Sequence, residues 1–355
     1  MRNYAAFTTL VTQKLQSSGT ADFSVSEVDN AIEEGLKEFS HLARPHIFPL
    51  ILPVESRYGT CSSTSVDNLR DTTKGQFLSG DATNEKVVHN RTDNTYAVVL
   101  SFSSTAQIGI SRDIFVVNDN YRIYNKRCTN KKQLFIGDMP DHSKIDSVEY
   151  PIGEKRNWEI IGEDILELKV DSVEDSNASS TVTDLPNVDV LIRFVRPHVL
   201  SQLTDWAGTF AATAAAGATT LSGSTLQSAG TIEIGEEFHV ENHKSRYIVT
   251  AATTIASNTA AITFYPGLES AVAATTWTFT FTQSSLLQNE EETFADLVAA
   301  RLAINKAPKF FNAINLGGGQ VWQNFQTWGE RRLSQVMKKI QSETPPKVKH
   351  LYTRE

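Results

Sequence analysis

Helical periodicity is confined to the two ends of this chain, and that distribution limits the possible folds more than any other feature of the sequence. Near the C-terminal end, apolar or small residues recur at steps of three and four and so share one stripe of an α-helix: Trp322, Phe325, Gly329, Leu333, Val336 and Ile340. Pro345 and Pro346 cannot continue a helix, because proline lacks an N–H and pushes the preceding residue out of the helical region. We therefore predict a closing helix followed by an extended arm over residues 345–355.

Three further helices are predicted. The first covers about residues 4–15, and the second begins with a capping box made by Ser24 and Glu27, with Phe23 and Val28 at the positions of a hydrophobic staple. The third begins near residue 289 and ends at Pro308, with a stripe of Phe294, Leu297, Val298 and Leu302. The shorter helices are near or below the ~12–15 residues at which an isolated helix is marginal in water, so they must pack on one another.

Between these ends the apolar pattern changes to period two, which is typical of strands. We predict turns at residues 118–120 and 162–164, and long loops or weak edge strands over the polar residues 55–92. The predicted strands cover residues 96–102, 114–118, 121–126, 158–161, 165–170 and 190–195.

A second change of composition begins near Trp206, where the sequence becomes rich in Ala, Thr and Gly. Clear alternation within residues 204–284 predicts a self-contained small β-barrel or β-sandwich. The economical architecture is α+β, a helical bundle formed by both chain ends with antiparallel β domains inserted into it. In this plan, residues 1–50 and 285–344 form the helical core, 51–203 and 204–284 are the insertions, and 345–355 are the arm.

Charge and cysteine content exclude several classes of protein. The formal net charge is −8, which argues against a protein that coats nucleic acid, because neutralising phosphates requires clustered Lys and Arg. Cys61 and Cys128 are too few for a disulfide framework or a thiolate zinc site and fit a reducing compartment, although one bridge between them stays open. The first sixteen residues match neither a signal peptide nor a membrane span, so we expect synthesis in the cytosol.

Patterns that carry catalysis or bind cofactors are absent from the sequence. His239 and His243 lie in a predicted hairpin without an acidic third ligand, and Gly317 to Gly319 lack the strand and Lys-Ser/Thr of a phosphate loop. The carboxylates around the turn at 162–164 fit the solvated face of a hairpin better than an acid–base pair: Glu159, Glu163, Asp164 and Glu167. We predict no enzymatic activity, no metal and no cofactor.

The C-terminal segment carries a basic excess, with seven Lys or Arg and two Glu from Arg331 to Glu355. Two interpretations stay open for residues 345–355. The segment is either a solvated tail or an arm that reaches a partner. The apolar residues Val348, Leu351 and Tyr352 are an unusual choice for a tail that only keeps the protein soluble.

Several short motifs, taken in order, resemble those of head–tail adaptor proteins of tailed bacteriophages, also called neck or connector proteins. The motifs lie at residues 29–32 (DNAI), 186–193 (PNVDVLIR), 197–200 (PHVL) and 326–329 (QTWG) with Leu333, followed by Pro345-Pro346. Residues 207–282 are similar to a small β module that recurs in phage virion proteins. The resemblance covers the ends and the strand near residue 190, and it covers residues 50–150 poorly.

The resemblance implies a structural protein of the virion neck at the portal vertex, made in the host cytoplasm. It would form a ring, usually of twelve subunits, with the portal and a tail or nozzle protein as partners. Double-stranded DNA would pass through this ring during packaging and ejection, with no membrane involved. We expect the portal or subunit interface to include Trp322, Trp328, Lys347, Val348, Lys349, Leu351 and Tyr352.

Two alternatives stay open. One is another virion component, such as a stopper, tail-completion or decoration protein, and copy number per virion would identify it. The other is a host-surface or polysaccharide-binding protein, or a glycosidase, built on the β domains, and sugar binding by the isolated β region would identify that.

Overall fold

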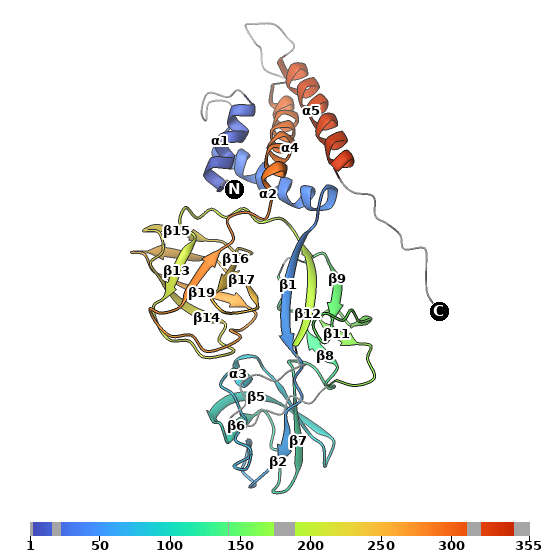
Figure 1. The fold of residues 1–355 in the computed structure, drawn as a ribbon, viewed down its shortest axis with the longest axis vertical. Coiled ribbons are helices and arrows are strands. Elements are labelled where there is room, and N and C mark those ends of the chain that lie inside the picture. The colour runs from blue at the N-terminus through green and yellow to red at the C-terminus, as the bar shows by residue number, and fades with distance from the viewer. Residues whose placement is uncertain (1–2, 16–22, 141, 174–188, 311–320, 344–355) are drawn as a thin grey trace, which may run out of the picture. The chain divides into compact units, whose positions relative to one another are not determined.

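The computed structural model describes residues 3–15, 23–140, 142–173, 189–310 and 321–343 (Figure 1). It has helices near both ends of the chain and antiparallel strands that include a closed six-stranded barrel, so the predicted α+β class is confirmed. The chain divides into two compact units. The helical unit comprises the described parts of Met1–His46, Arg196–Thr204 and Thr282–Glu355, and the β unit those of Ile47–Val195 and Asp205–Phe281.

The helices of the helical unit begin where local chemistry favours them. Ser24 accepts a hydrogen bond from the Glu27 N–H at 3.3 Å, and the Ser24 N–H donates to the Glu27 carboxylate at 2.9 Å, which confirms the capping box. Phe23 and Val28 are both buried in the core of this unit. The helices are α1 (Tyr4–Lys14), α2 (Val25–Leu42), α4 (Gln288–Lys306), a 3-10 turn (Ala307–Phe310) and α5 (Val321–Glu343).

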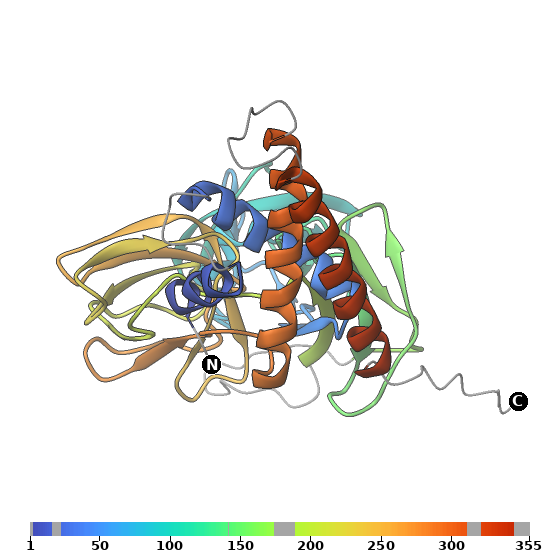
Figure 2. The same cartoon turned by 90° about the horizontal axis from the view of Figure 1, so that it is seen from above.

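Helix α4 is the centre of the helical unit and is buried on nearly all sides. The predicted apolar stripe is buried, but so are the alanines around it: Ala295, Ala299, Ala300 and Ala303. A helix that is apolar around most of its circumference belongs in a core, and alanine lets neighbouring helices approach closely. Figure 2 shows α5 on one side of α4 and α1 on the other, with α2 crossing behind α4.

The polar stretch 55–92 was predicted to be loops or edge strands, and this prediction is partly wrong. It supplies strands β2 and β3 at the two edges of a six-stranded antiparallel sheet, but also the interior strand β4, which pairs with both β5 and β7. Leu69, Phe77 and Val88 of this stretch are fully buried. The sheet runs in the order β2 (Tyr58–Thr60), β7 (Asn120–Tyr124), β4 (Val87–Asn90), β5 (Thr95–Ser104), β6 (Gln107–Ile110) and β3 (Asn68–Arg70), with helix α3 (Gly80–Thr83) beside β5.

The predicted strand at residues 114–118 does not form. The Asp119 carboxylate accepts hydrogen bonds from the Val116 N–H and the Asn90 side-chain amide, each at 2.9 Å. The Asn90 amide also donates to the Ile114 carbonyl at 2.6 Å. Side chains therefore bond backbone groups that a strand would use for pairing, and the segment becomes a turn that leads into β7.

Two three-stranded antiparallel sheets share one apolar core in the β unit. The predicted turn between β10 and β11 is confirmed, with Gly162 at a positive φ of 66° that glycine tolerates. One sheet contains β1 (His46–Pro53), β12 (Asp189–Arg196) and β9 (Lys144–Glu149), and the other β10 (Trp158–Ile161), β11 (Ile165–Leu168) and β8 (Gln133–Phe135).

Residues 207–281 form the closed barrel, around a cluster of aromatic rings in which Phe238 contacts Tyr247, Phe264 and Phe279. Gly208 is required where β13 passes this cluster, because a Cβ there would lie 2.4 Å from the Phe279 ring. The barrel order is β13 (Ala207–Phe210), β14 (Thr220–Ser224), β19 (Ala260–Tyr265), β17 (Arg246–Ala251), β16 (Glu237–Val240) and β20 (Thr278–Phe281), and β15 (Ala229–Ile232) pairs with β18 (Thr253–Ala256).

Three buried charged side chains and the half-buried Lys86 form a cluster where α3 meets the segments before β2 and β4. The Arg57 guanidinium donates to the Glu55 carboxylate at 2.9 Å, to Asp81 at 2.5 Å and to the Gln76 carbonyl at 2.6 Å. The Lys86 ammonium lies 2.5 Å from Glu55 and 3.1 Å from Asp81. Burial opposes ionisation of both carboxyl groups, but the two cations outweigh it and hold the pKa of Glu55 and of Asp81 below its usual range.

Cys61 and Cys128 are both free and buried, so no bridge joins them. Burial raises the pKa of the Cys128 thiol to about 12, which keeps it protonated and unreactive at neutral pH. In the described part of the chain, no helix has the length and apolar character needed to cross a membrane.

Candidate interaction surface

Helix α5 packs one face tightly on α4. Val336 and Ile340 are buried there, and Phe325 and Leu333 pack against the same core, which confirms the predicted stripe at these positions. Gly329 marks the closest approach, because a Cβ on it would lie 2.7 Å from the Ile304 side chain and 2.9 Å from the Ala300 carbonyl oxygen. The inner face of α5 is therefore buried against α4.

An ion-pair cluster fastens both α1 and α5 to α4. The Asp296 carboxylate lies 2.6 Å from the Lys14 ammonium of α1 and 2.8 Å from the Arg332 guanidinium of α5. Burial would lower the pKa of Lys14, but hydrogen bonds to Asp296 and Glu292 outweigh it and raise this pKa above its ordinary value. Arg332 therefore contributes to the contacts between helices within the helical unit.

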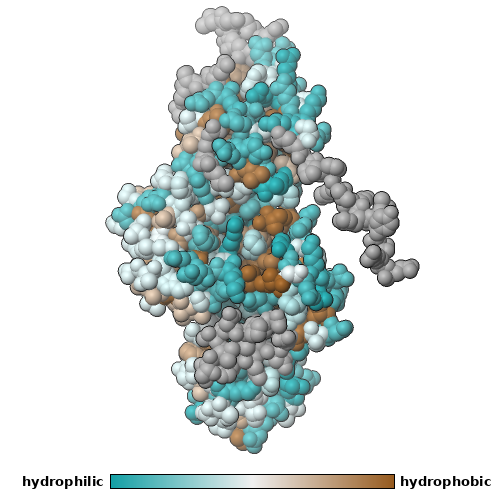
Figure 3. All heavy atoms as spheres, viewed as in Figure 1, coloured by the Kyte–Doolittle hydropathy of each residue, from teal (hydrophilic) through white to brown (hydrophobic). Residues whose placement is uncertain are grey.

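The outer face of α5 has a different character. Trp328 is 40% exposed there, and it shares a stripe at steps of three and four with Arg331, Gln335 and Lys338, which are also exposed. Figure 3 shows α5 as mostly hydrophilic on the side of the helical unit that is in view. An exposed tryptophan within a basic helix face is the arrangement expected of a contact surface, because aromatic residues anchor interfaces.

The structure describes only part of the predicted interface. Trp328 lies on the outer face of α5, and Trp322 lies within the bounds of α5 but its side chain is outside the described residues. The five predicted residues of the arm also lie outside the described residues: Lys347, Val348, Lys349, Leu351 and Tyr352.

Helix α2 presents an acidic outer face. Glu33 and Glu34 are exposed there, with Asp29 half-buried beside them and accepting a hydrogen bond from the Tyr4 hydroxyl at 3.1 Å. Lys37 is the basic residue on this face. Sequence analysis did not single out this face, because an acidic helix surface is common and gains meaning only beside a complementary surface.

A polar joint ties three distant segments of the helical unit together. The His198 ring donates from Nε2 to the Arg44 carbonyl at 2.8 Å and bonds Ser285 Oγ through Nδ1 at 2.9 Å. The His198 N–H donates to Ser40 Oγ at 2.7 Å, and Arg44 donates to the Glu290 carboxylate at 3.3 Å. The end of α2, the segment after β12 and the start of α4 are therefore joined at one point.

The burial of His198 in this joint predicts that the stability of the helical unit depends on pH. Burial lowers the pKa of His198 to about 4, against an ordinary 6.5. The hydrogen bond to the Arg44 carbonyl and the Glu290 charge oppose this shift, whereas the charges of His46 and Arg44 add to it. The unfolded chain therefore binds a proton below pH 6.5 that the folded state excludes. We expect His198 to contribute about 3 kcal/mol of stability above pH 6.5, lost as the pH falls from 6.5 to 4. Melting of the helical signal at 222 nm between pH 4 and 7 measures this loss.

The matched variant is His198→Gln, whose side-chain amide can still donate to the Arg44 carbonyl but cannot gain a proton. We expect this variant to lose less stability than the wild type over the same pH interval, although its stability at the upper end of the interval is lower. Equal slopes for the two proteins would contradict the assignment to His198.

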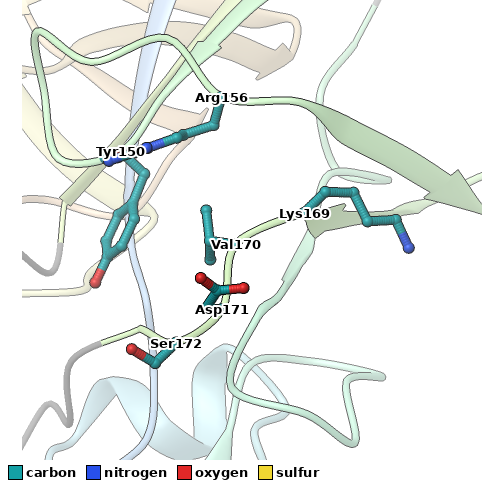
Figure 4. Close-up of a pocket in the computed structure, with 6 residues that line it drawn as sticks. All are labelled: Tyr150, Arg156, Lys169, Val170, Asp171 and Ser172. Carbon is teal, nitrogen blue, oxygen red and sulfur yellow. The ribbon is translucent and has the colours of Figure 1, made fainter. Parts of the chain in front are cut away.

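The β unit contains a polar hollow of about 330 Å³, and Figure 4 shows its lining. The Arg156 guanidinium donates to the Tyr150 carbonyl at 2.7 Å and pairs with Glu154, and the Lys169 ammonium, turned away from the other lining residues, pairs with Glu159 at 2.7 Å. Both cations are therefore paired with nearby carboxylates. The hollow is lined by Tyr150, Arg156, Lys169, Val170, Asp171 and Ser172, which do not combine a nucleophile with a base in hydrogen-bond contact.

The histidine and carboxylate side chains that the sequence offered as metal ligands or acid–base groups do not gather at one site. His243 bonds the Tyr247 hydroxyl at 2.5 Å and Ser270 at 2.9 Å, whereas His239 is exposed on β16. Asp164 pairs with Arg127 at 2.6 Å, as expected of a hairpin surface. Within the residues that the structure describes, no three His, Cys, Asp or Glu side chains are grouped so as to hold a metal ion.

Comparisons of this chain with protein-family models, with curated proteins and with solved structures found no match.

Proposed function

We propose that this protein is a structural subunit of a tailed-phage virion, and that it forms a ring adaptor between the portal and the tail through which DNA passes during packaging and ejection. The observation that supports this most is the helical unit, in which segments from both ends of the chain enclose the buried helix α4. Its outer surface includes a basic α5 face that carries the exposed Trp328. A rigid helical core with an exposed aromatic anchor is suited to repeated contacts between identical subunits.

The proposal keeps the domain plan drawn from the sequence. Residues 1–50 and 285–344 would build the ring, 51–203 and 204–284 would be carried as insertions, and the arm 345–355 would dock on the portal or a neighbouring subunit. The proposed partners are further copies of the chain, twelve in all as the resemblance implies, with the portal, a tail or nozzle protein and the passing double-stranded DNA. No catalytic role or cofactor is proposed, and the site of action would be the virion neck after synthesis in the host cytoplasm.

Truncation after Thr344 tests the proposed role of the arm. We expect the truncated protein to melt like the full chain and to form the same oligomer, but to attach to DNA-filled heads at least tenfold less well. The physical reason is that an extended segment adds to a partner through its backbone and selects it through side chains such as Val348, Leu351 and Tyr352. Electron microscopy of heads mixed with either protein at physiological salt counts the attached particles.

Two full-length variants separate the contributions within the arm. Replacing Lys347 and Lys349 by Ser removes charge, and replacing Val348, Leu351 and Tyr352 by Ser removes the apolar side chains. We expect the second change to weaken attachment more. Truncated protein that attaches as well as the full chain would show that the segment is only a solvated tail. A full chain that stays monomeric and binds no heads would overturn the adaptor proposal itself.

A further inference from the structure

Two outer helix faces of the helical unit carry opposite charge, one on α5 and one on α2. Among the α5 side chains that the structure describes, the exposed basic residues Arg331, Lys338 and Lys339 outnumber the exposed acidic residue Glu330. The exposed stripe of Trp328, Arg331, Gln335 and Lys338 points away from the buried Val336 and Ile340.

On α2, the acidic residues divide into two groups. Glu27 and Glu38 turn inward, where they pair with Lys306 and Arg301 of α4. The exposed residues Glu33 and Glu34 take no part in those inner pairs and, with Lys37 nearby, leave the outer face acidic. The acidity of this outer face is therefore not needed to hold α2 on α4.

We infer that the basic outer face of α5 in one copy docks on the acidic outer face of α2 in the next copy. This inference rests on the proposed function, because a ring closed by rotation needs two different, complementary surfaces on each subunit. Opposite charges steer the two faces together and set their register, while Trp328 supplies the apolar anchor of the contact. The occupant of both faces is a second copy of this chain.

A charge-swap experiment on the full chain tests this contact. The first variant combines Arg331→Glu and Lys338→Glu, the second combines Glu33→Lys and Glu34→Lys, and the third carries all four changes. We expect each single-face variant to raise the protein concentration at half-assembly at least tenfold, and the combined variant to recover most of the loss. Sedimentation velocity measures the oligomer, and negative-stain images show whether it is a ring.

One control and two further tests accompany these variants. The control, Arg91→Glu with Arg112→Glu, reverses two exposed cations of the β unit, changes the net charge as much as the α5 variant does, and should leave assembly unaltered. Trp328→Ala should weaken assembly while the melting temperature stays within a few degrees of the wild type, because Trp328 is not part of the core cluster of the helical unit. Higher salt should weaken assembly of the wild type, because exposed charges are screened.

Each outcome decides between the proposals. Rings that form equally well from the wild type and both single-face variants would overturn the α2–α5 contact and leave the adaptor function standing. Loss of assembly without recovery in the combined variant would show that the two faces do not contact each other, and would also overturn it. A wild type that forms no ring at any concentration, or on heads, would remove the adaptor function as well.

Discussion

Replacement of Arg57 by methionine is expected to lower the free energy of unfolding of the β unit by about 3–5 kcal/mol. Arg57 is fully buried and provides hydrogen bonds to Glu55, to Asp81 and to the Gln76 carbonyl. Without it, two buried carboxylates are left with Lys86 as the remaining cation of the cluster. The loss reflects uncompensated buried charge rather than the net value of an ion pair.

Urea unfolding and amide exchange over β4 and β7 measure this loss, since both strands lie inside the six-stranded sheet. The matched control is Arg127→Met, which removes a pair with Asp164 at the surface and should change stability by less than about 1 kcal/mol. Adding Glu55→Gln and Asp81→Asn to the Arg57 variant should recover part of the stability, because the remaining groups no longer carry two charges. Similar effects of Arg57→Met and Arg127→Met would contradict this account.

Replacement of Phe294 by alanine is expected to destabilise the helical unit by about 3–5 kcal/mol. The Phe294 ring is fully buried, with its centroid 5.0 Å from that of Phe7 and 5.5 Å from that of Phe39. A Cβ on Gly35 would lie only 3.1 Å from the same ring, so α2 packs closely against it. Removal of the ring opens a cavity where α1, α2 and α4 meet.

Thermal unfolding followed at 222 nm, at concentrations too low for assembly, measures this effect, because the long helices all lie in the helical unit. Trp328→Ala is the control, since it removes a large aromatic side chain from the outer face of α5 in the same unit. We expect its melting temperature to stay within a few degrees of the wild type. A Phe294 variant that melts like the Trp328 variant would show that the core does not depend on this contact.

Local patterns in the sequence were sufficient to predict the elements that depend on residues close together in the chain. The Ser24–Glu27 capping box and the α5 stripe through Val336 and Ile340 are both present in the structure. The hairpin at Gly162 and the alternation within the barrel were also predicted. In these segments one face is buried and the other is not, so periodicity records the burial directly.

Other elements were decided by contacts between residues far apart in the chain. The stretch that contains Glu55, Arg57 and Asp81 has the composition of a loop, yet these side chains are buried because each compensates the charge of another. Residues 114–118 have the apolar content of a strand, but the Asn90 and Asp119 side chains bind their backbone groups instead.

The candidate surface shows the same division. The sequence by itself determined that the chain ends in an amphipathic helix and that Trp328 lies at the margin of its apolar stripe. Only the tertiary structure decided that Arg332 turns inward to Asp296, that Glu27 and Glu38 pair with α4, and that the remaining charges form a basic face on α5 and an acidic face on α2. The physical reason is that helical periodicity reports which side of a helix is buried, whereas the partner of each charge depends on how the helices pack.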